Sequence, residues 1–385
     1  MRILYFSDIP IRRNSFGGPV VLHRLLSSLP ASELQVISTN MFDLAPGEEE
    51  IPANIWHYPL IRLIRTRLSG WYNLLMLALS PMLFRRLGRN IRLLKPDLIV
   101  TVSHGYAYFA AAFWARRMKV PYVIIHHDVY ATTFVKPAFA KNWINGRFAE
   151  AYQGAACNFC VSPYLTAYYS GLFNGRAITL FPGREDRSVA PHRLNKLPTE
   201  GLTLGYFGSI NSEELLDDFV ALANMISAGG HRIHLVGPVT DNQLNRRGLR
   251  VQNIICHPRM AQADLEKFVS ENIDALLIVQ ESHAIFREHV SVNFPSKLVE
   301  YTRFQLPVIV FAPGYASASK FAAEYPEALI AISSPAEDQE VWSVMTYLLD
   351  SELRQRLGQR VGELGERLFD SSVVRDVFLT GIKRS

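Results

Sequence analysis

The feature that most constrains this chain is a repeated alternation of short apolar strand patterns with helical patterns. The opening stretch Arg2–Ile9 is a β-rich apolar run, and a glycine-containing loop at 11–20 leads into a helical pattern of valine and leucine. A second strand is expected at Leu34–Ser38. Apolar strands without polar alternation are buried on both faces, as in parallel sheets, so this start predicts a β-α-β unit. The alternation continues, with further strands expected at Asp97–Val102, Val120–Ile125 and Asn158–Val161.

The stretch 181–201 interrupts this alternation, because it is rich in proline, glycine and charge and has no hydrophobic period. Such a composition is typical of a linker between domains. Strands are expected again at Leu202–Phe207, Arg232–Val236, Val251–Cys256, Ala275–Val279 and Pro307–Phe311. Helices are expected at Glu213–Ala228, Ala263–Glu271 and Ser296–Phe304, and throughout the chain after Val341. The sequence therefore predicts an α/β fold with two consecutive domains, 1–190 and 191–365, each with a parallel sheet.

Composition narrows the possible protein classes. The chain has 385 residues, of which 49% are hydrophobic and 19% charged, so it can bury a large core and is not expected to be disordered. Three cysteines are too few for a disulfide scaffold, which favours a reducing, cytosolic compartment. Asp8 precedes any apolar stretch of signal-peptide length, so secretion is not expected. The longest uncharged run, 68–84, is too short and too interrupted to predict a transmembrane helix.

The net charge of +5 is unevenly distributed. Residues 51–96 contain no Asp or Glu and carry eight basic side chains, which leaves the rest of the chain slightly acidic. On a helix, Arg85, Arg89 and Arg92 would share one face and leucines another, with Trp71 and Tyr72 upstream. This basic segment, 62–95, predicts contact with an anionic membrane surface. Two alternatives are nucleic acid, which is less favoured because leucine-rich interleaving stacks bases poorly, and a core-packed helix pair with a solvated arginine face.

The most informative segment is VNFPSKLVEYTRFQLPVIVF, 292–311. Pro295 and Ser296 indicate a helix start with Ser296 as the capping residue. The first turn of this helix would offer free N–H groups and the charge of Lys297 to a pyrophosphate. Glu300, one turn further, could accept hydrogen bonds from both hydroxyls of a ribose. The segment therefore predicts a nucleotide site, although an ordinary amphipathic helix with solvated Lys and Glu is the alternative.

These residues, with several others in order along the chain, resemble the GT-B glycosyltransferases, especially the retaining family-4 group. The other matching stretches are FGG at 16–18, KPDLIVTVSHGYA at 95–107, VPYVIIHHDVY at 120–130, CVSPYLTAYY at 160–169, LFPGRED at 180–186 and LTLGYFGSI at 202–210. The resemblance implies two Rossmann-like domains facing a cleft, with a nucleotide-sugar domain at 191–365. It also implies an acceptor-binding domain at 1–190 and a C-terminal helix, 366–385, that packs back on that domain.

The same resemblance implies the roles of individual residues. Gly17 and Gly18 would let the backbone approach the sugar or donor phosphate, although a plain turn is the alternative for Gly17. His127 and Asp128 would meet the sugar as catalytic residues, with His104 as a second candidate. His126 is expected to point the other way, into packing. The nucleotide side of the site would comprise Gly208 and Ser209 at the diphosphate, Arg259 and Met260 near the base, and Pro295, Ser296, Lys297 and Glu300.

Three features depart from the family pattern. The basic residues that usually follow the first strand of the second domain are absent, and the loop GSINSEELLDDF, 208–219, is acidic instead. Lys297 would then supply the charge, with Arg184 or Arg259 as further candidates. Val292 occupies the place of the first acid of the usual pair, and Glu288 is the nearest substitute. No metal motif is found, so a metal-independent reaction without cofactor is expected, and Cys157 and Cys160 are interpreted as core residues.

The resulting expectation is a hexosyltransferase that moves a sugar from a UDP- or GDP-linked donor to a hydroxyl of a lipid-linked or cell-surface glycan, with retention. Such a reaction belongs to polysaccharide or lipopolysaccharide biosynthesis. The protein would be cytoplasmic and peripherally bound to the inner face of the membrane, and would not bind nucleic acid. Two alternatives remain open: a GT-B-fold sugar-nucleotide epimerase, and a catalytically degenerate scaffold protein.

Overall fold

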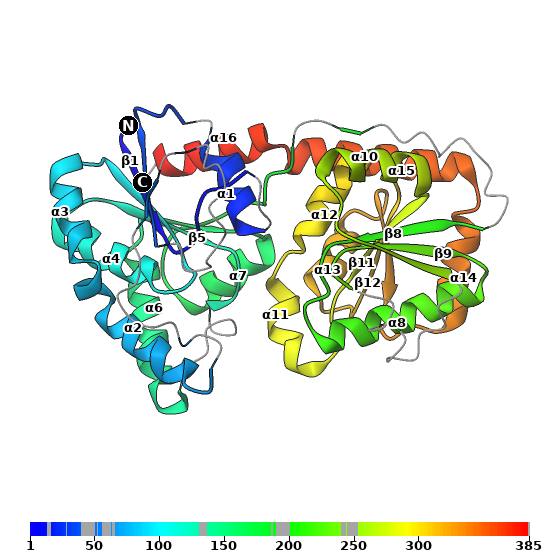
Figure 1. Cartoon of the computed structure of the whole chain (residues 1–385), viewed down its shortest axis with the longest axis horizontal. Helices are drawn as coiled ribbons and strands as arrows, with labels where there is room; N and C mark the ends of the chain where they lie inside the picture. The colour runs from blue at the N-terminus through cyan, green and yellow to red at the C-terminus, as the bar shows by residue number, and fades with distance from the viewer. Residues whose placement is uncertain are drawn as a thin grey trace. The chain divides into compact units, whose positions relative to one another are not determined.

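The structure is a computed structural model that describes residues 1–13, 17–27, 29–39, 51, 53–55, 63, 66–130, 137–185, 188–189, 201–239, 244 and 253–383. The chain forms two compact units (Figure 1). Unit 1 comprises Met1–Gly183 and Ser371–Ser385, and unit 2 comprises Arg184–Asp370. The boundaries expected from the sequence were 190/191 and 365/366. Most of the expected linker, 181–201, lies outside the described residues.

Unit 1 is built on a seven-stranded parallel sheet of order β3-β2-β1-β4-β5-β6-β7. Its strands are β1 (Ile3–Ser7), β2 (Leu34–Ser38), β3 (Ala53–Ile55), β4 (Leu98–Val102), β5 (Tyr122–His126), β6 (Cys157–Cys160) and β7 (Ala177–Thr179). Its helices are α1 (Gly18–Leu26), α2 (Ser69–Leu83), α3 (Arg85–Leu94), α4 (Ala107–Met118), η1 (Ala138–Ala140), α6 (Lys141–Gln153), α7 (Pro163–Leu172) and α16 (Ser371–Lys383).

Unit 2 is built on a six-stranded parallel sheet of order β10-β9-β8-β11-β12-β13. Its strands are β8 (Thr203–Phe207), β9 (Arg232–Val236), β10 (Ile254–His257), β11 (Ala275–Val279), β12 (Val308–Ala312) and β13 (Leu329–Ser333). Its helices are α8 (Glu213–Ala228), α10 (Gln262–Asn272), η3 (Ala284–Phe286), α11 (Arg287–Val292), α12 (Ser296–Tyr301), η4 (Thr302–Phe304), α13 (Ser317–Glu324), α14 (Asp338–Tyr347) and α15 (Ser351–Leu368).

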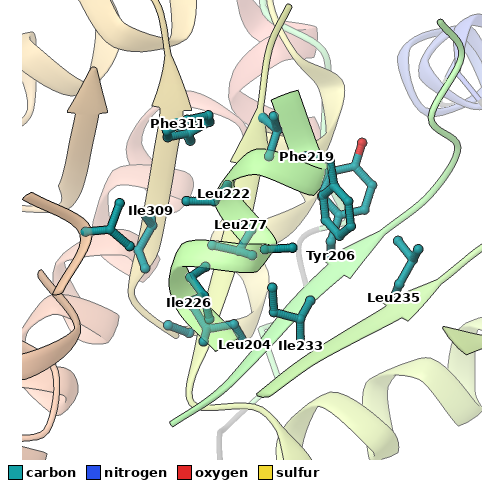
Figure 2. Packing of buried hydrophobic residues seen from close by; sticks show 14 of the residues in the cluster. Leu204, Tyr206, Phe219, Leu222, Ile226, Ile233, Leu235, Leu277, Ile309 and Phe311 are labelled. Carbon is teal, nitrogen blue, oxygen red and sulfur yellow. The ribbon is translucent and has the colours of Figure 1, made fainter. Parts of the chain in front are cut away.

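In each unit, buried hydrophobic side chains of helices pack against the sheet and form a core. In unit 2 the residues Phe219, Leu222 and Ile226 of α8 pack onto strand residues such as Leu204 and Leu277 (Figure 2). In unit 1 the core on one face is formed by α1 and α16, whose Leu22 and Phe378 are fully buried against the sheet. The C-terminal helix therefore belongs to unit 1, as the family resemblance implies.

The structure corrects three local expectations. The helix expected at Ser296–Phe304 ends at Tyr301 and continues as a 3-10 turn, and Pro295, not Ser296, is its capping residue. Proline has a fixed φ that suits this position and no side-chain oxygen, so no side-chain cap forms. The strand expected at Val251–Cys256 is β10, Ile254–His257, and 251–252 lie outside the described residues. Among the helices described, none is long and apolar enough to cross a membrane.

Candidate active site

In unit 2, the candidate residues gather where β8 reaches the carboxyl edge of the sheet. Gly208 follows β8 directly, has φ of 117°, and donates its N–H to the carbonyl of Val236 at 2.9 Å. A Cβ on Gly208 would lie 2.8 Å from Cε of Lys297. The positive φ favours glycine here, and the absence of a Cβ leaves room for the end of the Lys297 side chain. The carboxyl ends of parallel strands are where ligands bind in open α/β sheets.

Lys297 is the cation at this edge. Its Nζ donates a hydrogen bond to the carbonyl of Ser209 at 2.9 Å and another to the hydroxyl of Tyr206. Nζ also lies 3.9 Å from the centre of the Tyr206 ring, a cation–π distance. Burial lowers the pKa of Lys297 to about 7, although the carboxylate of Glu281 acts in the opposite direction. Lys297 is thus held over the loop after β8, and its protonation changes near neutral pH.

Tyr301 links helix α12, which carries Lys297, to β8 through a hydrogen bond. The Tyr301 hydroxyl accepts the N–H of Phe207 at 2.8 Å, and the phenol is fully buried. Pro295 and Glu300 are half-buried and Ser296 is exposed. Thus the helix that presents Lys297 and Glu300 has a fixed position relative to the end of β8.

Acidic side chains lie at the same edge and were not predicted. Glu281, two residues after β11, accepts a hydrogen bond from the hydroxyl of Ser212 at 3.2 Å. Asp218 of α8 accepts both the N–H and the hydroxyl of Ser282 at 2.7 Å. These bonds tie the start of α8 to the loop after β11. The polar pair Gln280 and Glu281 after a buried strand marks this edge in the sequence, but not the partner of Glu281.

The other nucleotide candidates are more dispersed. Arg259 is exposed and Met260 half-buried, both just after β10, the strand at the edge of the sheet. Glu288 is exposed in the first turn of α11, on a different helix from Lys297. Arg184 is fully buried, and its Nε donates to Asp370 at 2.6 Å, which fits a structural role. The proposed roles of Arg259, Met260 and Glu288 stay predictions.

In unit 1, the candidates lie at the carboxyl ends of β4 and β5. His127 and Asp128 follow β5, and His104 follows β4. Nε2 of His127 is buried, and no residue in the described part of the chain forms a hydrogen bond with it. Burial lowers the pKa of His127 to about 4, so the ring is neutral at pH 7. A buried ring nitrogen without a partner indicates a place where a ligand can complete the hydrogen bonding.

His127 also lines a pocket of unit 1 with an empty volume of about 340 Å³, which includes space open to solvent. The other walls are mainly apolar residues of α1, of β5 and of the loops after β6 and β7, together with Val374 of α16, and Arg24 and Ser371 are polar members. Gly17 is the capping residue of α1 with φ of 61°, which favours glycine, whereas Gly18 has no such φ and only ordinary contacts with Ile9. Phe16, the first residue of the FGG motif, lies outside the described residues.

His126 points into packing, as the strand alternation predicts. It is fully buried, with Nδ1 2.8 Å from the Ser103 hydroxyl and Nε2 3.0 Å from Oδ1 of Asn158. The amide of Asn158 donates to two backbone carbonyls, so Oδ1 is the acceptor and Nε2 of His126 carries the proton. Burial lowers the pKa of His126 to about 4.

The pKa of His126 predicts a loss of stability in acid. Between pH 6.5 and about 4 the unfolded chain protonates this histidine while the folded chain does not. The free energy of unfolding should therefore fall by up to about 3 kcal/mol as the pH decreases through this window. Denaturant titrations of the native chain and of His126→Gln measure this. The native chain should lose more stability than the variant, and the same pH dependence in both would contradict the assignment.

Asp8, at the carboxyl end of β1, was not predicted as a site residue. Its buried carboxylate accepts the N–H groups of Tyr106 and Ala107, which begin α4, and the hydroxyl of Thr39. A carboxylate at a helix N-terminus is stabilised by the free N–H groups there. Asp8 thus fixes the segment that follows His104. A lone acid directly after the first buried strand was the available signal.

The remaining candidates are the cysteines and possible metal ligands. Cys157 and Cys160 are buried free thiols in β6, and burial raises their pKa values to about 11 and about 12. Raised pKa values disfavour the thiolate, so both fit the core role that the sequence predicts. No group of three or more His, Cys, Asp or Glu side chains in the described residues is placed to hold a metal ion.

Comparison with known families gives a match within the first of the two units. Residues 17–182 match the model of glycosyltransferase family 4. This stretch lies within unit 1, which therefore resembles a domain of that family. The prediction of a glycosyltransferase is confirmed at the level of this domain. None of the curated proteins compared with the chain matches it.

Solved structures resemble the whole chain. HepE of Anabaena in complex with UDP has a TM-score of 0.70 at 14% identity, over 100% of both chains. The α,α-trehalose 6-phosphate synthase from Burkholderia multivorans has a TM-score of 0.64 at 13% identity, over 99% of this chain and 96% of that one. MurG of Acinetobacter baumannii has a TM-score of 0.54 at 13% identity, over 98% of both chains. At these identities the likeness shows the fold, and the predicted two-domain GT-B architecture is confirmed.

Proposed function

We propose that the protein transfers a sugar from a nucleoside-diphosphate donor to a hydroxyl of a lipid-linked or cell-surface glycan. The observation that carries this proposal is the arrangement of Lys297, Gly208 and Ser209 at the carboxyl edge of the unit 2 sheet. A cation beside a glycine-containing loop suits a diphosphate, since phosphate oxygens can approach a backbone that has no side chain. The family 4 match within unit 1 and the UDP bound to HepE support this choice of donor.

In the proposed reaction, the acceptor oxygen bonds to the anomeric carbon of the donor sugar. The bond from that carbon to the diphosphate oxygen breaks, the diphosphate leaves with the electron pair, and the proton of the acceptor hydroxyl passes to the leaving diphosphate oxygen. Lys297 would stabilise the charge that develops on the leaving group. The neutral ring of His127 would hydrogen-bond a sugar hydroxyl through its unpartnered Nε2, with Asp128 beside it. We propose that the transfer needs no metal and retains the anomeric configuration, which rests on the family resemblance.

The proposed nucleotide would lie along unit 2 from Gly208 to Glu300. Ser296 and Pro295 would border the diphosphate, while Arg259 and Met260, after β10, would meet the base. Glu288 is proposed as the substitute for the acid that Val292 replaces. We propose that the protein meets its acceptor at the cytoplasmic face of an anionic membrane, and that the basic segment 62–95 contacts this membrane. Arg62 and Arg65 of that segment lie outside the described residues.

The proposal is tested by calorimetric titration with UDP and GDP, followed by an assay of nucleotide release. Binding of either nucleotide, with release that increases when a crude lipid-linked acceptor is added, is the expected result. Binding of neither nucleotide would leave only a scaffold role. Binding without any stimulation by acceptor, but with interconversion of the sugar, would favour the epimerase.

Glu300→Gln tests the ribose contact. If the carboxylate accepts both ribose hydroxyls, its loss should weaken UDP binding by about 1–3 kcal/mol, because hydrogen bonds to a charged acceptor are the stronger ones. Calorimetry on the variant and on Glu271→Gln, an exposed acid of α10, provides the comparison. An unchanged dissociation constant for UDP in Glu300→Gln would show that Glu300 does not bind the ribose.

A further inference from the structure

Helix α2 presents its apolar side to solvent. It carries no charged residue; of its polar residues, Asn73 and Ser80 are buried and Ser69, at its first position, is half-buried. The outward side is a continuous apolar stripe at helical spacing: Leu68, Trp71, Leu75, Ala78 and Met82. Trp71 is 61% exposed and Met82 73% exposed. A surface helix normally turns polar residues outward, so core packing does not explain this face.

Aromatic side chains from a distant part of the chain extend the stripe. Phe139 of η1 is 67% exposed, and its ring centre lies 5.0 Å from that of Trp71. Trp143, one turn into α6, is also exposed. Although the two rings contact each other, both stay more than half exposed, so the pair leaves a large apolar area in water. The stripe of α2 with Phe139 and Trp143 is called the apolar patch below.

Exposed basic residues lie on α3, the helix that follows α2 in the chain. The inward side of α3 is formed by Leu87, Gly88 and Ile91, which are buried. All four arginines of α3 are exposed, and one further basic residue lies at each end of the helix pair. The exposed basic residues are Arg67, Arg85, Arg86, Arg89, Arg92 and Lys95. Since residues 51–96 contain no acid, this charge is not neutralised within the segment.

We propose that the apolar patch inserts into the headgroup region of a bilayer rich in anionic phospholipid, while the α3 arginines contact the lipid phosphates. This inference rests on the proposed function, which expects a lipid-linked acceptor. Tryptophan is favoured at the membrane–water interface, and each basic residue near an anionic surface adds to the attraction. Figure 1 shows α2, α3 and α6 on the same side of unit 1, away from α1 and α16.

Other occupants fit the surface less well. A nucleic acid could use the arginines and stack on the exposed aromatic rings, but Leu68, Leu75 and Met82 neither stack on bases nor bind phosphate. A second copy of the chain, packed patch to patch about a two-fold axis, would bring arginine faces together and repel. An anionic bilayer satisfies the apolar and the basic parts of the surface at once.

The test is sedimentation of the full chain with vesicles. The native chain should sediment with vesicles of phosphatidylcholine and phosphatidylglycerol, and much less with phosphatidylcholine alone. The double variants Trp71→Ser with Phe139→Ser, and Arg85→Glu with Arg89→Glu, should each bind anionic vesicles at least about tenfold more weakly. Matched controls are Leu172→Ser, an exposed leucine of α7, and the double variant Arg356→Glu with Arg360→Glu on α15. The controls should bind like the native chain.

Three results would overturn the inference. The native chain could remain in solution with anionic vesicles, or the patch variants could sediment like the native chain. Light scattering could also show that the native chain is a dimer, that it does not bind vesicles, and that the patch variants are monomers. Calorimetry with UDP on the same proteins separates this inference from the proposed function. Patch variants should keep native UDP affinity. If the native chain binds vesicles but not UDP, the proposed donor site is contradicted and the proposed membrane surface is supported.

Discussion

Replacing Lys297 with alanine is expected to reduce turnover at least about 100-fold, because one positioned donor to a developing phosphate charge commonly contributes that much. Lys297 lies over the loop after β8, where its Nζ already donates to the carbonyl of Ser209. A diphosphate oxygen placed there would take over such a hydrogen bond. The measurement is the rate of nucleotide release with donor and acceptor present.

Two further variants make this result interpretable. Lys297→Met keeps an unbranched apolar side chain next to the Tyr206 ring, over which Nζ lies in the native chain, and should lose activity to a similar extent. Lys267→Ala removes an exposed lysine of α10 and should leave turnover unchanged. Near-native activity in both Lys297 variants would remove this residue from the site. Thermal unfolding of each variant checks that the fold is intact.

The second large effect is expected at the ion pair between Arg184 and Asp370. Arg184 is fully buried, its Nε lies 2.6 Å from Asp370, and its Nη1 donates to Thr302 at 3.1 Å. Removing one partner of a buried pair leaves a desolvated charge without its counter-charge, which costs about 3–5 kcal/mol. Asp370→Ala should therefore lower the free energy of unfolding of unit 2 by roughly this amount.

A surface pair in the same unit is the control for this prediction. Arg360 and Glu363 of α15 are 2.9 Å apart with both side chains largely exposed. Glu363→Ala should change stability by less than about 1 kcal/mol, because water already screens the pair. Denaturant titration measures both variants. Equal effects of the two substitutions would show that the Arg184 pair contributes no more than a surface contact.

Hydrophobic periodicity predicted several strands with accurate bounds, because each is a short and mostly buried apolar run. The expected strands at Leu34–Ser38, Arg232–Val236 and Ala275–Val279 have the observed bounds of β2, β9 and β11. Edge and short elements were missed. Strand β7 has three half-buried residues, and β13 alternates buried and exposed positions, so neither produces a long apolar run. The helix after Pro295 was predicted too long, since its last turn tightens to 3-10 geometry.

The candidate site was predictable only where its residues are close in sequence. Lys297 and Glu300 follow from a local helix-start pattern. Tyr206 lies 91 residues from Lys297, and only the fold brings its hydroxyl to Nζ. Asp8 likewise reaches the start of α4, 98 residues away. Glu281 was missed for the same reason: its partner Ser212 is on another β-α loop, and no local pattern connects them.

The most direct test of the donor site is the proton uptake that accompanies UDP binding. Lys297 has a pKa of about 7 in the free protein, so at about pH 8 most of it is neutral. A bound diphosphate favours the ammonium form and should draw a proton from the buffer.

Calorimetric titration of UDP in two buffers of different ionisation enthalpy, at about pH 8, measures that proton directly. We predict that UDP binds the native chain with net proton uptake, and that Lys297→Met binds it more weakly with this uptake removed. Tight binding with the same proton uptake in both proteins would contradict a diphosphate site at Lys297, and no binding to the native chain would contradict the nucleotide site itself.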